Sequence, residues 1–420
     1  MNIIHENNTD DILVIGSGVI GLFCAYTLQK NGFQVTIFDK YEPGLQCSFG
    51  NAGAITPNYA LPNAAPGAFK NIPKWLFTKY GPLSIDPLYF PKLLPWLYLF
   101  LKQCSKKNTD YNIKSLLNLH FESLSEYEKI LNEIDLDLLL KKTSCIHVYK
   151  TEKQFNKSYN LWKMLDSNGV NLSILNCKEL KSEEPNISDD YKIGVKLSNS
   201  GLIKDPYFLC KKLFDSFLKI GGKFYINEVK DIISKSNTKI EIITYNDSFS
   251  FNKCVVTAGA WSKHIINSLN IKIPLESERG YHVNTSYKRD GPLNVVMESN
   301  YKFMATPLEN GTRFAGTAEF SGLTKPPNYN RSSNLKYLSK QMYPNLKFEN
   351  TNEWMGQRPS FPDSKPIIDQ YPHNKNIILS FGHGHRGLVG APITSKIVLN
   401  FIKNNKQNIN VEPFSINRFS

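Results

Sequence analysis

The stretch that decides the fold is DDILVIGSGVIGLFCAYTLQKNGFQVTIFDK, residues 10–40. Residues 12–15 form a short, continuous apolar run, which predicts a buried strand of a parallel sheet. Apolar residues then recur at helical intervals from Ile20 to Leu28, and Asn31-Gly32 predicts the end of that helix. Residues 35–38 form a second apolar run, which ends at Asp39. The order strand, helix, strand predicts an α/β domain.

Three glycines in GxGxxG spacing separate the first strand from the helix. Gly16 permits a tight turn, Gly18 permits the close approach of a pyrophosphate, and Gly21 permits close packing of the helix against the strand. The helix N-terminus offers free N–H groups to phosphates, and Asp39 can accept hydrogen bonds from ribose hydroxyls. The pattern therefore predicts a Rossmann-like dinucleotide site. It does not separate NAD from FAD, but an acid at position 39 with no arginine directly after it argues against NADP.

Composition adds broad limits. The 420 residues predict two domains, and seven cysteines without a CxxC pair argue for a reducing compartment and against zinc or a disulfide framework. The net charge of +13 is compatible with a nucleic-acid partner, with an anionic membrane surface or with a general drift of composition. The opening MNIIHENNTDD is polar and acidic, unlike a secretory signal, so the predicted location is cytoplasmic.

The segment PLYFPKLLPWLYLFLKQC, residues 87–104, has two interpretations. Its apolar run is too short to span a bilayer and is interrupted by prolines and a lysine. Apolar residues nearly encircle a helix, which favours burial in a domain core. The alternative is an interfacial helix on the inner face of the cell membrane, with Trp96 and Tyr98 at headgroup level and Lys92 and Lys102 facing anionic lipid.

Further along the chain, the sequence predicts a second segment that reaches the nucleotide site, and a second domain. In KCVVTAGAWS a buried strand ends at a glycine-containing turn around Gly259, so the nucleotide domain is predicted to be discontinuous. Residues 115–134 have helical periodicity, and Asn310-Gly311 between alternating runs predicts a hairpin. We expect a nucleotide-binding domain formed by 1–85, 151–275 and 351–420. An α+β domain with a large mixed or antiparallel sheet is expected from 86–150 and 276–350.

The C-terminal sequence GHGHRGLVGAP, residues 382–392, combines four glycines with two histidines. His383 and His385 share a face if the chain is extended, yet the cluster contains no carboxylate or cysteine, so we predict no metal site. The glycines permit the backbone to pass close to a flat ring, and a helix is expected from about Ala391.

These motifs together resemble the D-amino acid oxidase-like family of FAD oxidoreductases over nearly the whole chain. The resemblance rests on GSGVIG with Asp39, on SFGNAG, TAGAW, ERGYH and GQRPSFPDSKPII, and on GHGHRGL. Within the family, the sequence is most similar to the bacterial D-amino acid dehydrogenase small-subunit type. The fold implied is a discontinuous FAD domain plus a substrate domain whose large mixed sheet covers the flavin.

The resemblance also implies the cofactor and the residues that hold it. FAD is expected to be non-covalent, because no cysteine follows Cys254 and residues 47–53 contain no histidine, the two positions at which relatives tether the flavin. The residues expected to bind it are Gly16, Ser17, Gly18, Ile20, Gly21, Asp39, Lys40, Ser48, Asn51, Ala52, Gly53, Gly259, Gly382, Gly384, His385, Gly387 and Leu388.

Three residues are candidates for the catalytic site. Arg358 matches the Arg-Pro motif that binds the substrate carboxylate in several members, and a guanidinium grips a carboxylate as a fork. Its alternative role is to pin the 355–365 segment through backbone carbonyls. Tyr281 either contacts the substrate carboxylate as a second group or lies in the core. Arg386 either covers the flavin ring or lies next to the substrate. Arg279 is expected to form a structural ion pair.

The predicted reaction is oxidation of the C–N bond of a D-amino acid. Hydride leaves the α-carbon for flavin N5, and water hydrolyses the imino acid to a 2-oxo acid and ammonia. The electrons go to oxygen or to a quinone, and the dehydrogenase resemblance favours the quinone. Alternatives on the same fold are a glycine, sarcosine or proline-type oxidase and a D-hydroxyproline dehydrogenase. Alternatives of other classes are a basic flavoprotein acting on RNA, although no nucleic-acid partner is expected, and an NAD-dependent dehydrogenase.

Overall fold

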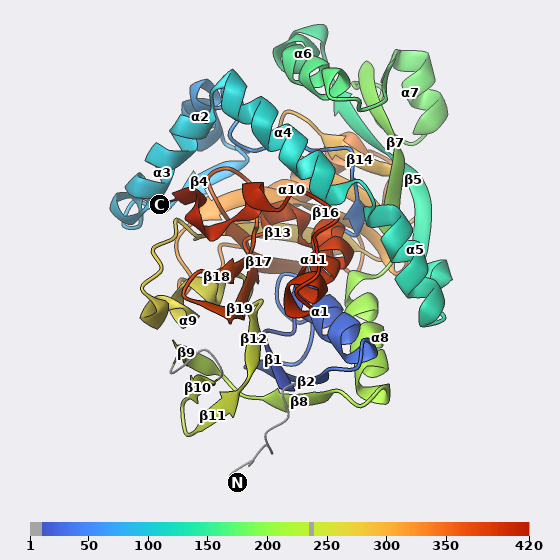
Figure 1. The fold of residues 1–420 in the computed structure, drawn as a ribbon. Coiled ribbons are helices and arrows are strands. Elements are labelled where there is room, and N and C mark those ends of the chain that lie inside the picture. Colours follow the sequence, from blue (N-terminus) through green and yellow to red (C-terminus); the bar gives the residue numbers. More distant parts are fainter. Residues whose placement is uncertain (1–10, 235–238, 420) are drawn as a thin grey trace.

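The computed structural model describes residues 11–234 and 239–419, and these form three β-sheets (Figure 1). Residues 1–10, which carry the argument against a secretory signal, lie outside the described residues. One sheet has six strands in the order β18, β19, β12, β1, β2, β8. Their bounds are Asp11–Ile15 (β1), Gln34–Asp39 (β2), Lys223–Ile226 (β8), Lys253–Val256 (β12), Ile367–Tyr371 (β18) and Asn374–Phe381 (β19). The sheet is therefore assembled from separated parts of the chain, as predicted.

The central strand β1 explains the continuous apolar run. It pairs in parallel with β2 on one side and with β12 on the other. Ile12 and Val14 contribute to one hydrophobic core, and Leu13 and Ile15 contribute to a second core on the opposite face. Both faces of the strand are buried, so alternation of polar and apolar residues is absent.

Helices cover one face of this sheet and a small sheet covers the other. The helices are α1 (Val19–Lys30), α5 (Ser123–Glu133), α8 (Pro206–Lys219) and α11 (Gly387–Ile402), and α1 contacts both α8 and α11. The small sheet consists of β9 (Val229–Ser234), β10 (Ile240–Thr244) and β11 (Ser248–Phe251). Helix α11 begins four residues earlier than the expected start at Ala391, because the 3₁₀ turn Gly384–Arg386 leads directly into it.

The third sheet has ten strands and is mixed. Its main path is β17 (Asn352–Ser360), β13 (Glu276–Thr285), β16 (Gly311–Phe320), β15 (Phe303–Leu308), β14 (Val295–Glu298), β5 (Leu140–Tyr149), β7 (Ile193–Ile203) and β3 (Ala54–Ile55). β4 (Leu83–Ile85) pairs with β16, and β6 (Leu172–Leu175) pairs with β7. The hairpin predicted at Asn310-Gly311 joins β15 to β16. The predicted fold class, a Rossmann-like α/β part plus a large mixed sheet, is confirmed.

The sheets divide the chain differently from the expected domain boundaries. β3, β7 and β17 lie in segments assigned to the nucleotide-binding domain, yet all three belong to the ten-stranded sheet. β17 pairs with β13 along its whole length, and β7 pairs with β5. The difference arises because strand pairing between distant segments cannot be read from one sequence. The domain boundaries stay a prediction.

The remaining helices are α2 (Ala68–Phe77), α3 (Phe90–Gln103), α4 (Lys106–His120), α6 (Glu152–Ser167), α7 (Cys177–Glu183), α9 (Ser262–Ile265) and α10 (Asn330–Met342). Most of them surround the large sheet, whereas α9 packs against β9. The helical periodicity noted over 115–134 is borne out by two helices, because α4 ends at His120 and α5 begins at Ser123. Among the described residues, no helix combines the length and apolar character that crossing a bilayer requires.

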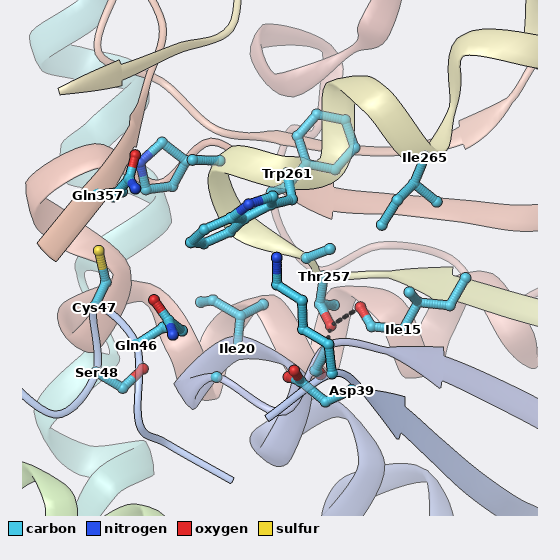
Figure 2. A pocket seen from close by; sticks show the side chains of 18 of the residues that line it. Ile15, Ile20, Asp39, Gln46, Cys47, Ser48, Thr257, Trp261, Ile265 and Gln357 are labelled. Carbon is cyan, nitrogen blue, oxygen red and sulfur yellow. Dashed lines mark hydrogen bonds between the residues drawn. The ribbon is translucent and has the colours of Figure 1, made fainter. Parts of the chain in front are cut away.

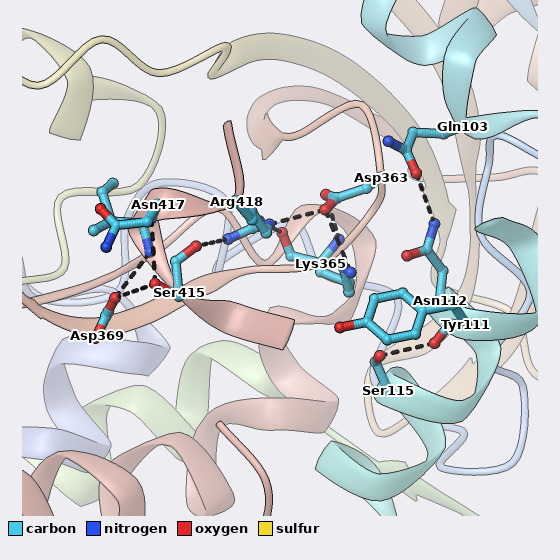
Figure 3. Close-up of polar contacts among 11 residues, drawn as sticks. Gln103, Tyr111, Asn112, Ser115, Asp363, Lys365, Asp369, Ser415, Asn417 and Arg418 are labelled. Atoms are coloured by element: carbon cyan, nitrogen blue, oxygen red, sulfur yellow. Dashed lines mark hydrogen bonds and ion pairs between the residues drawn. The ribbon is translucent and has the colours of Figure 1, made fainter. Parts of the chain in front are cut away.

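The C-terminal tail fastens the segment between β17 and β18 (Figure 3). Arg418 donates to the Asp363 carboxylate at 2.8 Å and to the Lys365 carbonyl at 2.7 Å. The buried ammonium of Lys365 lies 4.4 Å from the ring centre of Tyr111 on α4. Burial lowers the pKa of Lys365 from 10.5 to about 8, although Asp363 counteracts this. Tail, segment and α4 therefore form one buried polar cluster.

Candidate active site

A cavity of about 470 Å³ opens at the carboxyl ends of β1, β2, β12 and β19 (Figure 2). Asp39 approaches it from β2, and Cys47 and Ser48 approach it from the loop that follows β2. Thr257 and Trp261, from the segment after β12, line another side. Ligands of open α/β sheets bind in this position, where backbone groups at strand ends and helix starts are accessible.

The fingerprint glycines have separate roles in the walls of this cavity. Gly16 adopts φ +106°, and a Cβ there would lie 2.8 Å from the Thr257 carbonyl oxygen. A Cβ at Gly21 would lie only 1.9 Å from the Gly16 carbonyl oxygen. Gly18 lines the cavity, and its nearest neighbour would be the Ser48 hydroxyl at 3.5 Å. Gly16 and Gly21 are therefore required by protein packing, whereas Gly18 leaves space for a ligand.

Asp39 organises the glycine turn from the end of β2. Its carboxylate accepts hydrogen bonds from the Ser17 N–H at 2.6 Å, from the Ser17 hydroxyl at 2.8 Å and from the Tyr41 N–H at 3.0 Å. Next to it, the Lys40 ammonium lies 4.5 Å from the ring centre of Trp261. Asp39 and Lys40 both line the cavity, while Ser17 lies behind it.

Ser48 connects the following loop to the start of α1. Its hydroxyl accepts a hydrogen bond from the Val19 N–H at 2.9 Å, one of the N–H groups that a helix start leaves without a helical partner. Asn51 lines the cavity as well, and its side chain accepts from the Gly53 N–H at 2.9 Å. Ala52 and Gly53 lie outside the lining, and a Cβ at Gly53 would lie 2.5 Å from the Ile203 carbonyl oxygen.

The C-terminal glycine cluster forms the opposite wall. Gly382 and Gly384 have positive φ, and both line the cavity together with Gly387 and Leu388 in the first turn of α11. His383 is buried, its Nε2 lies 3.0 Å from the Thr394 hydroxyl, and burial lowers its pKa to about 3. Within the described part of the chain, no three potential ligands gather around a metal position. The cluster thus presents backbone and a helix N-terminus to the cavity.

Arg358 lies beside the cavity in a buried ionic cluster with Glu278, His385 and Ser360. Its Nη1 donates to the Thr317 carbonyl at 2.8 Å and lies 3.4 Å from the Glu278 carboxylate. His385 Nε2 lies 3.1 Å from the same carboxylate, and the Ser360 hydroxyl donates to it at 2.9 Å. Burial raises the pKa of Glu278, but His385, Arg358 and Ser360 outweigh burial and hold it at about 2. Glu278 is therefore ionised, and its carboxylate lies between the Arg358 guanidinium and the His385 ring.

The other two catalytic candidates are engaged with the protein. The Tyr281 hydroxyl donates to Glu319 and accepts from the Asn328 N–H at 2.9 Å, and the side chain is buried. Arg386 donates to the Leu61 carbonyl at 2.6 Å and to the Tyr59 carbonyl at 3.3 Å. Like Arg358, neither residue belongs to the cavity lining, and the catalytic roles of all three stay predictions. Arg279 is structural as expected, but its partners are the carbonyls of 322, 325 and 326 rather than a carboxylate.

Most of the expected cofactor residues line one cavity. They are Gly16, Gly18, Ile20, Asp39, Lys40, Ser48, Asn51, Gly259, Gly382, Gly384, Gly387 and Leu388. The expectation did not include residues 227–230, Trp261, His264, Ile265 and Gln357, which line the same cavity. Trp261 and Gln357 belong to TAGAW and GQRPSF, two of the motifs on which the family resemblance rests, so both residues could have been predicted from the sequence. Residues 227–230 lie where the chain leaves β8 for β9, and no motif marks them.

A glycine turn, an acid at the end of the second parallel strand and a second glycine wall define a dinucleotide-binding oxidoreductase. The family model of FAD-dependent oxidoreductases (DAO) matches residues 11–400, and the chain belongs to this family. A D-amino-acid oxidase of Bradyrhizobium diazoefficiens is 31% identical over 418 residues, which are 97% of this chain and 98% of the relative. A D-amino acid dehydrogenase of Vibrio atlanticus is 28% identical over 97% of this chain and 100% of the relative.

Solved structures confirm the fold. A glycine oxidase from Geobacillus kaustophilus has a TM-score of 0.75 at 18% identity, covering 97% of this chain and 98% of that one. An L-proline dehydrogenase from P. horikoshii has a TM-score of 0.76 at 18% identity, covering 98% and 97%. The predictions of the family, of an enzyme and of FAD are confirmed, and the alternative of an NAD-dependent dehydrogenase is excluded.

The residues of the cavity fit FAD. The starts of two helices, Val19 and Ile20 in α1 and Gly387 and Leu388 in α11, line the same space and suit anionic or electron-rich groups. Asp39 is available for ribose hydroxyls, and Gly18 lines the cavity with only the Ser48 hydroxyl, at 3.5 Å, near its Cβ position. A dinucleotide presents ribose hydroxyls, a pyrophosphate and a second ring system in turn. Asp39, the glycine turn and the start of α11 provide one partner for each of these parts.

Proposed function

We propose that this protein oxidises the C–N bond of a D-amino acid to an imino acid, which water hydrolyses to a 2-oxo acid and ammonia. The names of the two relatives support this substrate class. Bound FAD supplies the hydride acceptor. The chain's own contribution is to bind the carboxylate, orient the α-carbon and limit access of water.

The observation that carries the proposal is the ionic cluster beside the glycine wall. The Arg358 guanidinium and the His385 ring both contact the single carboxylate of Glu278, at 3.4 and 3.1 Å, and only Nη1 of Arg358 takes part in this contact. The Arg358 side chain is 18% exposed, and its Nη2 has only a long contact, 3.4 Å, with the Gly316 carbonyl. A substrate carboxylate would complete the coordination of this guanidinium.

We assign the remaining candidates to supporting roles. Tyr281 fixes the backbone at Asn328, and Arg386 fixes the backbone at 59 and 61. Both side chains hold neighbouring backbone segments in place, and neither is proposed to contact the substrate. FAD is proposed to be bound without a covalent tether, because residues 47–53 contain no histidine and no cysteine follows Cys254.

Anaerobic reduction of the flavin tests the substrate. The holoenzyme is mixed with D- and L-amino acids, glycine, sarcosine and the two hydroxyproline epimers, and loss of the oxidised flavin absorbance is followed. D-amino acids are expected to bleach it fastest. Bleaching by glycine, sarcosine or proline-type substrates alone would assign the protein to the amine oxidases, and bleaching by no amino acid would refute the proposal.

Arg358→Lys tests the carboxylate role, since a lysine retains the charge but lacks the fork. The substrate KM is expected to rise by at least about tenfold, as for the loss of a charge-assisted bond. Arg418→Lys is the matched control, because that arginine also pairs with a buried carboxylate, 2.8 Å away at Asp363. The chain neighbours of Arg358, Gln357 and Pro359, line the cavity, whereas those of Arg418 do not. An unchanged KM in Arg358→Lys would remove Arg358 from the substrate site.

We further propose a quinone as the electron acceptor, with the protein on the inner face of the cell membrane through 87–104. The dehydrogenase among the relatives supports an acceptor other than oxygen. Comparing hydrogen peroxide release under air with anaerobic reduction of a soluble quinone analogue tests this. Stoichiometric peroxide with no quinone reduction would make the protein an oxidase.

A further inference from the structure

Residues 66–107, here called the platform, expose apolar side chains at unusual density. They contain α2, β4, α3 and the start of α4, and Figure 1 shows α2 and α3 next to one another at the edge of the molecule. Of the 24 large apolar side chains that are exposed among the described residues, seven lie in the platform. These are Phe69, Phe77, Leu88, Phe90, Leu94, Tyr98 and Leu101. Phe90, Leu94, Tyr98 and Leu101 recur at helical spacing along α3 and form one exposed apolar stripe, and contiguous exposed apolar surface marks an interaction site.

The platform is anchored to the protein by its other face. Leu93, Trp96 and Phe100 of α3 pack with Ala68 of α2 and with Phe320 in one hydrophobic cluster. The Trp96 indole N–H donates to the Ser360 carbonyl at 3.2 Å. Helix α3 therefore has a core face and, opposite it, an apolar face without a partner in the described structure. Trp96, expected at headgroup level if the helix were interfacial, lies in the core instead, whereas Tyr98 is exposed.

The charge of the platform is strongly one-sided. It contains seven lysines, all exposed, at positions 70, 74, 79, 92, 102, 106 and 107. Its single acidic residue is Asp86, which is paired with Lys325. The platform thus holds +6 of the chain's net charge of +13. None of the seven lysines forms an ion pair with another described residue, so their charges are available to an external anionic partner.

We infer that the platform is a docking surface for an anionic lipid bilayer. The exposed apolar side chains enter the boundary between headgroups and acyl chains, and the lysines contact the lipid phosphates. Phe77 and Leu88, which are 88% and 89% exposed at the ends of the two helices, are the insertion points. A bilayer fits better than a protein partner, because α2, α3 and the start of α4 each carry lysines beside the exposed apolar side chains, and protein interfaces are depleted in lysine.

The platform contacts a segment that lines the cavity. Residues 321–329, the strap, contribute Leu323 and Thr324 to the cavity lining. Lys325 of the strap pairs with Asp86, and a Cβ at Gly322 would lie 2.9 Å from the Tyr89 ring. A docked protein would therefore hold this edge of the cavity near the bilayer, where a quinone is dissolved. The link to the acceptor rests on the proposed function, whereas docking itself requires no turnover.

Co-sedimentation of the flavin-loaded full chain with vesicles tests the inference. Vesicles of phosphatidylcholine containing phosphatidylserine are compared with vesicles of phosphatidylcholine alone. Binding is expected only to the anionic vesicles, and it should be lost at about 1 M salt, where the Debye length is about 3 Å. Equal binding to both vesicle types, or no binding to either, would overturn the inference.

Variants locate the surface. Phe77→Ser combined with Leu88→Ser, and Lys70→Gln combined with Lys74→Gln and Lys79→Gln, should each weaken vesicle binding at least about tenfold. The matched control is Leu138→Ser combined with Tyr245→Ser, which removes side chains that are 78% and 74% exposed elsewhere. The inference fails if the control weakens binding as much. It also fails if the platform variants bind like wild type, or if they instead dissociate a dimer in sedimentation velocity.

The experiment separates this inference from the proposed function. Vesicle binding is measured without substrate, and flavin bleaching by D-amino acids is measured without vesicles. Bleaching without docking refutes the platform alone, and docking without bleaching refutes the proposed substrate alone.

Discussion

Gly21→Ala and Gly18→Ala are expected to damage the nucleotide site in different ways, although both change the same fingerprint. A Cβ at position 21 would lie 1.9 Å from the Gly16 carbonyl oxygen and 2.7 Å from the Thr257 hydroxyl. Ordinary contact begins at 3.4 Å, so α1 and the turn must separate by about 1.5 Å. At position 18 the nearest atom is the Ser48 hydroxyl at 3.5 Å, which is an ordinary contact.

The magnitudes follow from these contacts. Overpacking against rigid backbone costs about 3 kcal/mol. The displacement also strains the hydrogen bonds from the Thr257 hydroxyl to the carbonyls of Ile15 and Gly16, at 2.9 and 3.0 Å, worth about 1 kcal/mol each. Gly21→Ala should therefore lower the free energy of unfolding by about 3–5 kcal/mol. Gly18 occupies the N-cap of α1 at φ −71°, where alanine costs at most about 1 kcal/mol.

The assay measures two quantities on each variant: the flavin-to-protein ratio after gel filtration, and the urea midpoint with and without added FAD. Gly18→Ala should keep the FAD-free midpoint near wild type and lose flavin, because Gly18 lines the cavity and an added methyl group takes space from the ligand there. Gly21→Ala should lower both midpoints. Gly32→Ala is the control for backbone strain alone, since nothing lies within 4 Å of its Cβ position but its φ is +91°. It should lower both midpoints by less than Gly21→Ala does and should keep its flavin. A wild-type midpoint for Gly21→Ala, or full flavin retention by Gly18→Ala, would refute the reasoning.

Two further predictions concern the cluster of Figure 3. Arg418→Ala leaves the buried Asp363 with only Lys365, 3.7 Å away, and should lower the free energy of unfolding by about 3 kcal/mol while flavin content stays unchanged. Equal melting temperatures would contradict this. For Lys365 the folded pKa of about 8 lies below 10.5, so the unfolded chain binds more protons between these values and stability rises with pH there. Lys365→Met should be more stable than wild type by at most about 3 kcal/mol below pH 8, and the difference should shrink toward pH 10.5. A difference independent of pH would contradict this assignment.

The nucleotide site was predictable because its parts are local in sequence. Two apolar runs, three glycines and Asp39 within residues 10–40 determine the turn, and each must be present for the packing around Gly16 and Gly21. The C-terminal glycine wall was placed by resemblance, since nothing in 382–388 alone indicates that it faces Gly18. Residues 227–230 were missed for a physical reason: they line the cavity only because β8 pairs with β2 before the chain turns into β9.

The ionic cluster shows most clearly what one sequence cannot reveal. Glu278 and Arg358 are direct cross-strand partners of β13 and β17, although 80 residues separate them. In ERGYH, period-2 alternation indicates that Glu278 and Gly280 share a face, but not which side chain of another strand lies opposite. The decisive residue is Gly280, because a Cβ there would lie 2.0 Å from Nη2 of Arg358. The absent side chain provides the space through which the guanidinium reaches Glu278.

Gly280→Ala therefore separates the position of Arg358 from its charge. The obstructed atoms are at the far end of a flexible side chain, so the fold should tolerate the methyl group at a cost of about 1 kcal/mol while the guanidinium moves away from Glu278. If Arg358 binds the substrate carboxylate, KM should rise about as much as in Arg358→Lys, and adding Gly280→Ala to Arg358→Lys should cause little further loss, since both changes remove one interaction. Additive losses in the double variant would show that Gly280→Ala affects KM by a route other than Arg358. An unchanged KM in Gly280→Ala would show that substrate binding does not depend on the position that Arg358 takes beside Glu278.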